Sequence, residues 1–429
     1  MRFLLPISYG NINCRSFSEE LSRFIFGSSP IRLECLFLTT FEIIIYMKES
    51  LSISNLGPIK HVELNDLGDF IVLIGESGSG KSTIMKVLGL FRWLYKMQNI
   101  RSYLKHSNIS KSPFQFRMET YLKNCGLEEF VTPKTSIIYR VTASSDKVYD
   151  VKFANGRLSG TSNSELIYAG DMSFIKISFI SETRNIIPLW ADKGAQLAGG
   201  YLGFYFHEVY NDFELATNAL KDFNIPFLNL KFAVRRTSQG KKFMIESAGK
   251  NKYEINFKNS SSGTQTSIPI SILADYFSST FNPEEAFNRS LFKYLSNSDR
   301  LTDFKPVKNL SEIDQKIFMH IEEPELSLFP DAQCMLISSL VEKCFQKSVH
   351  KMGIILSTHS PYIVNHLNLL IKSYDTKNDG AGLDYEKVNV YQVVDGEIFD
   401  LKIKNQRLIN TNPLSETIDN IYKEYNRLA

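Results

Sequence analysis

The nine residues GESGSGKST, from Gly75 to Thr83, constrain this chain more than any other stretch. They follow an apolar run, Phe70 to Ile74, and apolar residues recur at helical spacing after them. This strand, loop and helix order is the setting that the phosphate-binding pattern GxxxxGKS/T requires. The glycines let the backbone close around a phosphate, and the amide groups at the start of the helix point at the anion. The sequence therefore predicts an α/β fold with a nucleoside triphosphate site.

Individual residues of this loop have predictable roles. Lys81 places a positive charge on the β and γ phosphates, and the hydroxyl of Ser82 is a ligand for Mg²⁺. The expected cofactors are therefore ATP and Mg²⁺. The predicted phosphate-binding residues are Gly75, Glu76, Ser77, Gly78, Ser79, Gly80, Lys81, Ser82 and Thr83.

Two later segments end apolar strands with polar residues. In KIFMHIEEPELSLFP, residues 316–330, both carboxylates of the EE pair can reach the phosphate crevice because the chain leaves the sheet there. We assign Glu322 to the Mg²⁺ shell and Glu323 to polarising the attacking water. In STHSP, residues 357–361, His359 stands where it can touch a γ-phosphate. The alternatives are an exposed acidic turn and a solvated histidine, and the phosphate loop upstream favours the functional interpretation of both segments.

The segment KNSSSGTQTSIP, residues 258–269, has the composition of a flexible linker. It also suits a phosphate contact, since small residues permit close approach and a hydroxyl and free N–H groups supply donors. A helix expected over residues 268–277 would aim its positive end at the anion. Both interpretations are open on composition alone.

The order phosphate loop, SSGTQ, IEEPE and STHSP resembles an ABC-type ATPase head. That class includes transporter motors, chromosome-maintenance and break-repair heads, and the overcoming-lysogenization-defect ATPases. The resemblance implies a RecA-like core, an antiparallel β-subdomain and a helical signature lobe. It also implies that Ser262 and Gly263 act in trans on ATP bound by the opposite subunit. The expected assembly is a homodimer that sandwiches ATP and that could build a higher oligomer. Ser261 and Thr264 depart from the LSGGQ signature.

Three features indicate which branch of the ABC-type class the chain resembles. The interval from Lys81 to Glu322 is too long for a compact transporter motor, and residues 185–310 contain no apolar heptads sustained over three repeats, as an arm would need. PELSLFP and FISETR are similar to segments of compact heads from antiphage systems such as Septu and PARIS. This resemblance implies a sensor or scaffold subunit of an antiphage defence system. The chain after His359 is short for a domain of its own, so the effector, a nuclease, is expected to be a separate protein. The alternative is a DNA-repair or chromosome-associated clamp on duplex DNA.

The expected organisation has four parts. Residues 1–46 form an N-terminal extension of doubtful status, with Met47 as a candidate true start. Residues 47–184 form the first half of the core with the phosphate loop and β-subdomain, 185–315 a mostly helical signature lobe, and 316–429 the second half of the core. Hairpins are expected at Asn155-Gly156 and around the basic pairs of residues 235–242.

Composition limits the partners. Forty-nine basic and 46 acidic residues leave a net charge of +3, which by itself indicates neither nucleic acid nor an anionic membrane. DNA contact is thus left open. The five cysteines never form a CxxC pair, and no uncharged apolar run reaches the length of a membrane span. A cytoplasmic location without membrane contact is expected.

Overall fold

The structure is a computed structural model. The predicted N-terminal extension, residues 1–46, lies outside the part of the chain that it describes. The described residues are 47–109, 117–160, 166–191, 203–238, 240–250, 252–295, 304–306 and 312–428.

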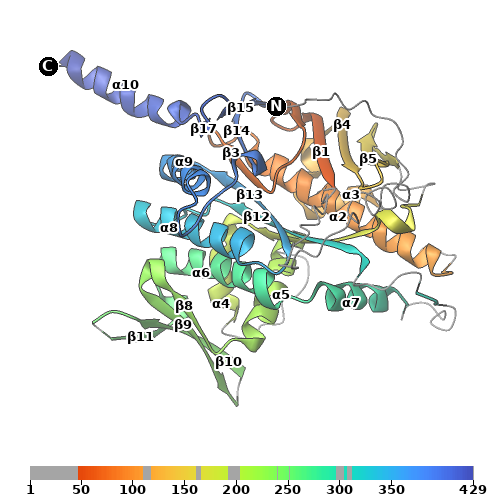
Figure 1. Ribbon diagram of the computed structural model, residues 1–429, viewed down its shortest axis with the longest axis horizontal. Helices are drawn as coiled ribbons and strands as arrows, with labels where there is room; N and C mark the ends of the chain where they lie inside the picture. The colour runs from red at the N-terminus through yellow and green to blue at the C-terminus, as the bar shows by residue number, and fades with distance from the viewer. Residues whose placement is uncertain are drawn as a thin grey trace, which may run out of the picture. The chain divides into compact units, whose positions relative to one another are not determined.

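A six-stranded sheet forms the centre of the fold (Figure 1). Five of its strands are parallel, and the edge strand β15 runs antiparallel to β14. Alternate residues of the central strand face opposite cores: Ile71 and Leu73 on one side, Phe70, Val72 and Ile74 on the other. Burial on both faces explains the uninterrupted apolar run in the sequence. The strand order is β15 (Glu397–Asp400), β14 (Val388–Val394), β3 (Phe70–Ile74), β13 (Lys351–Thr358), β12 (Asp314–Glu322) and β7 (Ser173–Ile180).

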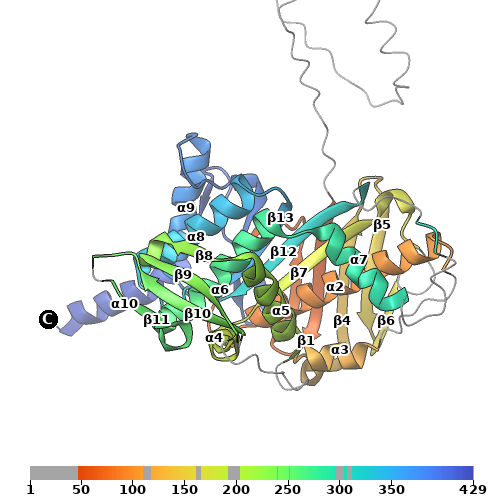
Figure 2. The same cartoon turned by 90° about the horizontal axis from the view of Figure 1, so that it is seen from below.

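One face of this sheet is covered by the long helix α2 (Lys81–His106) and a five-stranded antiparallel sheet (Figure 2). The predicted hairpin at Asn155-Gly156 is confirmed, because both residues adopt positive φ, 52° and 69°, as a tight turn requires. The sheet order is β2 (Ile59–Leu64), β1 (Lys48–Leu56), β4 (Val131–Thr142), β5 (Val148–Ala154) and β6 (Arg157–Gly160). A short helix, α3 (Met118–Asn124), precedes β4.

The opposite face carries the helices α6 (Ser262–Asp275), α8 (Pro330–Val341) and α9 (Pro361–Asp375). Their buried side chains, such as Ile268, Leu336 and Val364, share one core with the even-numbered residues of β3. Each of these helices follows a segment that the sequence singled out as chemical, so packing of the helices also positions the site.

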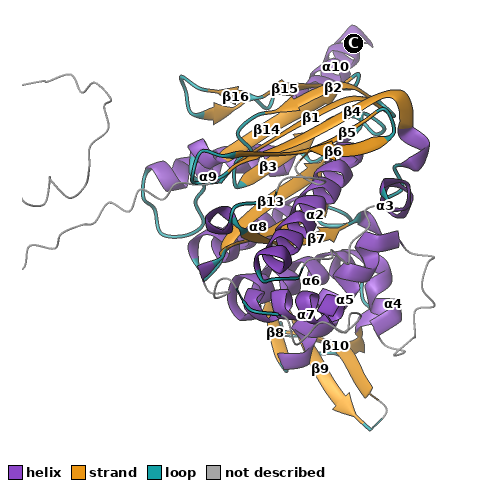
Figure 3. Ribbon diagram, turned by 90° about the vertical axis from the view of Figure 1, so that its right-hand side faces the viewer, coloured by secondary structure: helices purple, strands orange, loops and turns teal. Residues whose placement is uncertain are grey.

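The signature lobe is less helical than predicted. Its helices α4 (Ile187–Ala191), α5 (Gly203–Ala219), α6 and α7 (Pro283–Leu295) are joined by a second antiparallel sheet, seen at the bottom of Figure 3. That sheet forms because alternate residues such as Phe232 and Phe243 are buried on one face. The predicted basic hairpin is confirmed as β9–β10. The strand order is β11 (Glu254–Asn256), β10 (Gly240–Ser247), β9 (Leu230–Thr237) and β8 (Asp222–Ile225).

The chain ends with a two-stranded sheet, β16 (Lys402–Ile403) and β17 (Leu408–Ile409), and with helix α10 (Asn412–Leu428). Within the described ranges, no helix is long and apolar enough to cross a membrane. The architecture agrees with the predicted α/β class: a largely parallel core, an antiparallel β-subdomain and a lobe that carries the signature segment.

A buried ion pair joins the two large sheets through α2. Arg92 donates from Nη2 to Oε2 of Glu49 at 2.6 Å, and the Tyr139 hydroxyl lies 2.7 Å from the other carboxylate oxygen. Burial alone would raise the pKa of Glu49, but Arg92 and Lys316, with the hydrogen bonds, hold it below its ordinary value. Burial, together with Arg92, keeps the pKa of His320 well below 6.5, so its neutral Nε2 can accept from Arg92 at 3.1 Å. The layers are thus fixed by charge as well as packing.

Replacing Glu49 by Ala should lower the free energy of unfolding by about 3–5 kcal/mol, because it leaves the charge of Arg92 buried and unpaired. The loss should shrink at low pH, since the contribution of Glu49 disappears as pH falls through its lowered pKa. Urea unfolding at two pH values measures both effects. The control is Asp150→Ala, whose partner Arg140 is half exposed, with an expected cost under about 1 kcal/mol. Equal losses in the two variants would contradict the assignment.

Candidate nucleotide-binding site

The carboxyl ends of four parallel strands meet at one edge of the central sheet. In register, Ile74 of β3 pairs with Thr358 of β13, and Ser357 pairs with Glu322 of β12. Ile180 at the end of β7 pairs with the residue before Glu322. Loops that are far apart in sequence therefore open into the same crevice, which is where open α/β sheets bind ligands.

The phosphate loop follows β3 and leads directly into α2. Gly75, Gly78 and Gly80 have φ values of 146°, 81° and 111°, which side chains rarely permit. The Lys81 ammonium donates to the carbonyl oxygens of Gly75 at 2.9 Å and Glu76 at 2.8 Å. Burial lowers the pKa of Lys81, and nearby carboxylates counteract that effect. These bonds close the loop on itself and hold the ammonium group of Lys81 at the start of α2.

A cavity of about 410 Å³ lies over this loop and collects most of the predicted residues. Neither Ser262 nor Gly263 of the same chain lines it. Five residues without a predicted role also line it: Pro58, Lys86, Phe130, Glu182 and Ser357. The predicted residues in its wall are Ser77, Gly78, Gly80, Lys81, Ser82, Thr83, Glu322, Glu323 and His359.

Glu322 has the surroundings of a metal ligand. Its side chain is buried, with 2% of the residue exposed, and within the described ranges neither carboxylate oxygen has a hydrogen-bond partner. Burial, and then the neighbouring carboxyl of Glu182, raises the pKa of Glu322 to about 8. Such a carboxylate gains from a cation, and oxygen ligands from Glu322 and Ser82 suit Mg²⁺. The donor set fits the predicted metal, and Glu182 adds a second carboxylate to it.

Glu323 and His359, both predicted to be catalytic, are brought together. His359 Nε2 lies 3.7 Å from Oε1 of Glu323, and both side chains are partly exposed to the cavity. Glu323 has a positive φ of 43°, which is uncommon for a residue other than glycine. The main-chain N–H of His359 donates to Oε1 of Glu325 at 2.7 Å. The sequence analysis gave Glu325 no role, although it fixes the backbone of the histidine.

Other contributors were also missed by sequence reasoning. Glu182 lies two residues after the end of β7, and an acid near a strand end was the signal that could have revealed it. Phe130 is 37% exposed in the cavity wall, and its ring offers an apolar face to a purine base. No local sequence pattern distinguishes Phe130, because only the fold brings it to the phosphate loop.

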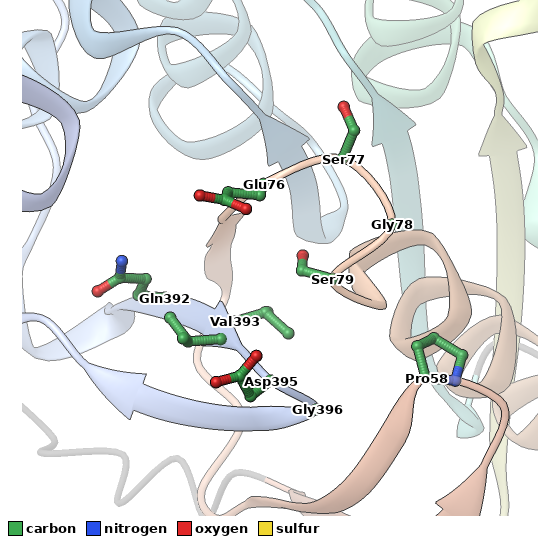
Figure 4. A pocket seen from close by; sticks show the side chains of 10 residues that line it. Pro58, Glu76, Ser77, Gly78, Ser79, Gln392, Val393, Asp395 and Gly396 are labelled. Carbon is green, nitrogen blue, oxygen red and sulfur yellow. The ribbon is translucent and has the colours of Figure 1, made fainter. Parts of the chain in front are cut away.

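A second cavity of about 530 Å³ lies on the other side of the loop, between Glu76–Ser79 and the β14–β15 turn (Figure 4). The side chains of Glu76, Ser79 and Asp395 border it. Lys81 and the carboxylates of β12 do not line this cavity, so we place the phosphates and metal in the first one.

The serine-rich segment is ordered as a helix start rather than as a linker. Helix α6 begins at Ser262, six residues before the predicted start, because the Ser261 side chain caps it by accepting from the N–H of Thr264 at 3.4 Å. A side chain at Gly263 would come within 2.5 Å of the Ser327 carbonyl oxygen, so only glycine fits there. Ser262 itself is exposed at the positive end of the helix.

The chain is similar to several known proteins. Residues 204–364 match the protein family described as AAA ATPase domain. Over 166 residues the chain is 32% identical to the DNA replication and repair protein RecF of Rickettsia africae and 35% identical to that of Rickettsia rickettsii. Each match covers 37% of this chain and 43% of the relative. The chain therefore spans less than half the length of these curated relatives.

Two solved structures give weaker overlaps. The RecF structure from the RecFOR pathway has a TM-score of 0.36 at 12% identity, covering 83% of this chain and 98% of the other. The SMC head domain from Thermotoga maritima has a TM-score of 0.34 at 10% identity, covering 83% and 99%. The sheet topology and the residues that share one cavity agree with the predicted fold class, that of an ABC-type ATPase head.

Replacing Lys81 by Ala should weaken ATP binding about 10- to 150-fold, because a charge-assisted contact of about 1.5–3 kcal/mol is lost. Equilibrium binding of a fluorescent ATP analogue measures the change. Lys60→Ala, on exposed β2 outside the cavity, is the control and should bind like the wild type. Unchanged binding by the Lys81 variant would remove the loop from the site.

Replacing Glu322 by Gln should stabilise the protein when nucleotide and metal are absent. With a pKa of about 8 in the folded protein against an ordinary 4.5, ionising Glu322 costs stability, and that cost grows as pH rises between these values. The midpoint of thermal unfolding in EDTA should therefore rise at pH 8.5 and stay near that of the wild type at pH 4.5. Glu119→Gln, on exposed α3, should change neither midpoint. A destabilised Glu322 variant at pH 8.5 would refute the buried-charge interpretation.

Proposed function

We propose that this protein hydrolyses ATP to ADP and phosphate in an ABC-type site. The observation that carries the proposal is a single cavity lined by the phosphate-loop lysine, two carboxylates from the end of β12 and the histidine that follows β13. These groups supply phosphate binding, metal ligation and activation of water, which are the tasks of phosphoryl transfer.

The roles follow from the geometry. Lys81 exchanges its bonds to loop carbonyls for bonds to the β and γ phosphates. Ser82 and Glu322 would hold Mg²⁺, with Glu182 beside them, and bound Mg²⁺ would neutralise charge on the phosphates. Glu323 would take the proton of the attacking water. His359, whose Nε2 lies 3.7 Å from Oε1 of Glu323, would orient the γ-phosphate. The ring of Phe130 offers the base an apolar face.

The site is completed by a second copy of the chain. The cavity does not include Ser262 or Gly263, although Ser262 stands exposed at the positive end of α6. A helix N-terminus of this kind binds an anion, and in a twofold dimer it would meet the γ-phosphate of the partner subunit. ATP bound between the two subunits would then hold the homodimer together, and hydrolysis would let the subunits separate.

We propose that this ATP-dependent dimerisation controls a separate effector, a nuclease, in antiphage defence. After His359 the described chain adds α9, the strands β14–β17 and α10, which belong to the core or extend from it. The PELSLFP turn and FISETR segment support the defence assignment by resemblance.

The second candidate is an ATP-driven clamp on duplex DNA. It is favoured by the relatives named as DNA replication and repair proteins. Residues 221–258 also carry nine basic and three acidic residues, although the whole chain is only +3. Stimulation of the purified ATPase by duplex DNA would favour the clamp, whereas a nuclease that co-purifies with the chain from its host would favour the effector.

Mixing two inactive variants tests the shared site. Lys81→Ala and Ser262→Arg should each abolish hydrolysis alone, because every site of either homodimer contains one defect. Random reassortment should restore about a quarter of the wild-type activity, since one site of each mixed dimer inherits no defect. Phosphate release by the mixture, compared with each variant alone, measures this. Full activity of the Ser262 variant alone would exclude a role for α6.

A further inference from the structure

Arg184 is the most connected buried side chain near the site. It follows β7, and only 1% of it is exposed. The described part of the chain shows no ion pair for it, and every acceptor of its bonds is a main-chain carbonyl. Its guanidinium therefore holds backbone segments together rather than neutralising a partner. Nε donates to Thr266 at 2.9 Å, Nη1 to Ser181 at 3.0 Å and Glu322 at 2.6 Å, and Nη2 to Glu323 at 2.5 Å.

At one end, Arg184 fixes the backbone of the proposed base. The N–H of Glu323 donates to the Ser357 carbonyl at 2.9 Å, and its own carbonyl accepts from Arg184. Both main-chain groups are thus held while φ stays at 43°, an uncommon value for a residue other than glycine. This conformation sets where the carboxylate points, 3.7 Å from His359.

At the other end, Arg184 holds the signature helix. Thr266 lies in the second turn of α6, and its carbonyl accepts from Nε. The hydroxyl of the same residue lies 2.9 Å from the Leu326 carbonyl oxygen, in the loop after β12. Gly263 packs directly against the same loop at Ser327. Two parallel links, Arg184 and Thr266, therefore fasten α6 to the chain that carries the carboxylates.

Arginine suits this position for a physical reason. Burial lowers the pKa of Arg184 to about 10, and the carboxylates of Glu325 and Glu182 counteract the effect, so the side chain stays charged at neutral pH. Charged donors form short, strong bonds, and the planar fork reaches acceptors in several directions. Lysine keeps the charge but cannot span three segments from one nitrogen.

We propose that Arg184 is a positioning residue that couples the base Glu323 in one nucleotide site to helix α6, which completes the site of the second copy. The inference rests on the proposed function and extends it to communication between the two sites. The phosphate loop does not depend on this link. Loss of Arg184 should therefore spare ATP binding while hydrolysis and ATP-dependent dimerisation fail together.

Arg184→Lys is the first test. Its ATP affinity should stay within about threefold of the wild type, and its turnover should fall about 10- to 100-fold, as a misplaced catalytic group predicts. In a Glu323→Gln background that retains ATP, sedimentation should show loss of the ATP-dependent dimer. Arg92→Lys is the matched control, because Arg92 is equally buried but its hydrogen bonds go to Glu49 and His320 rather than to α6 and Glu323. It should unfold at a lower temperature but keep turnover per folded molecule and dimerisation.

Thr266→Val is a milder test that does not depend on the folding of the arginine variant. It removes the second link and should lower turnover about 3- to 10-fold with ATP affinity unchanged, as loss of one hydrogen bond predicts. Thr217→Val is its control, since Thr217 is a buried helical threonine in α5 whose hydroxyl bonds only within that helix in the described structure. The control should match the wild type.

The outcomes separate the two proposals. If the wild type hydrolyses ATP and both test variants behave like their controls, Arg184 does not couple the sites and only this inference falls. If the wild type binds ATP without hydrolysing it, the proposed function falls and the inference falls with it. Retained ATP affinity with joint loss of turnover and dimerisation supports the coupling.

Discussion

The parallel pairing of β7, β12, β13 and β3 is the constraint on which the rest of the structure depends. Because the four strands run in one direction and in matched register, their carboxyl ends open together. The phosphate loop, the Glu322-Glu323 pair and His359 therefore converge although the chain separates them widely. Helices on both faces bury the strands, and this burial prevents the register from slipping.

Because the strand ends converge, the carboxylates of Glu322 and Glu323 occupy positions that cost the folded protein free energy. Glu322 is buried beside another carboxyl, and Glu323 holds a positive φ. Hydrogen bonds from Arg184 and to β13 hold the backbone around both residues. These bonds offset the free energy that the buried carboxyl and the positive φ cost. A bound cation would offset the negative charge of these carboxylates. The site is thus shaped for its ligands rather than for stability.

Much of the fold and the site could be predicted from local pattern. The phosphate loop, the strand ends with Glu322 and His359, and the Asn155-Gly156 turn depend on neighbours in sequence, and the structure has them as predicted. The start of α6 was misplaced because the Ser261 cap and the glycine contact involve geometry that composition hides. Of the sheet β8–β11, only the β9–β10 hairpin was predicted, and the edge strands β8 and β11 were missed because they have four and three residues.

By itself the sequence determined the chemistry: a lysine and glycine loop after an apolar strand has few other uses, since backbone amides and one charge suffice to bind a phosphate. Only the tertiary structure decided which distant residues share that site. Phe130 lies in an ordinary local context, and strand register and loop packing bring it together with Glu182 and Glu325. The same holds for Arg184, whose acceptors come from three segments. Such contacts depend on distance in space, which no local pattern of residues encodes.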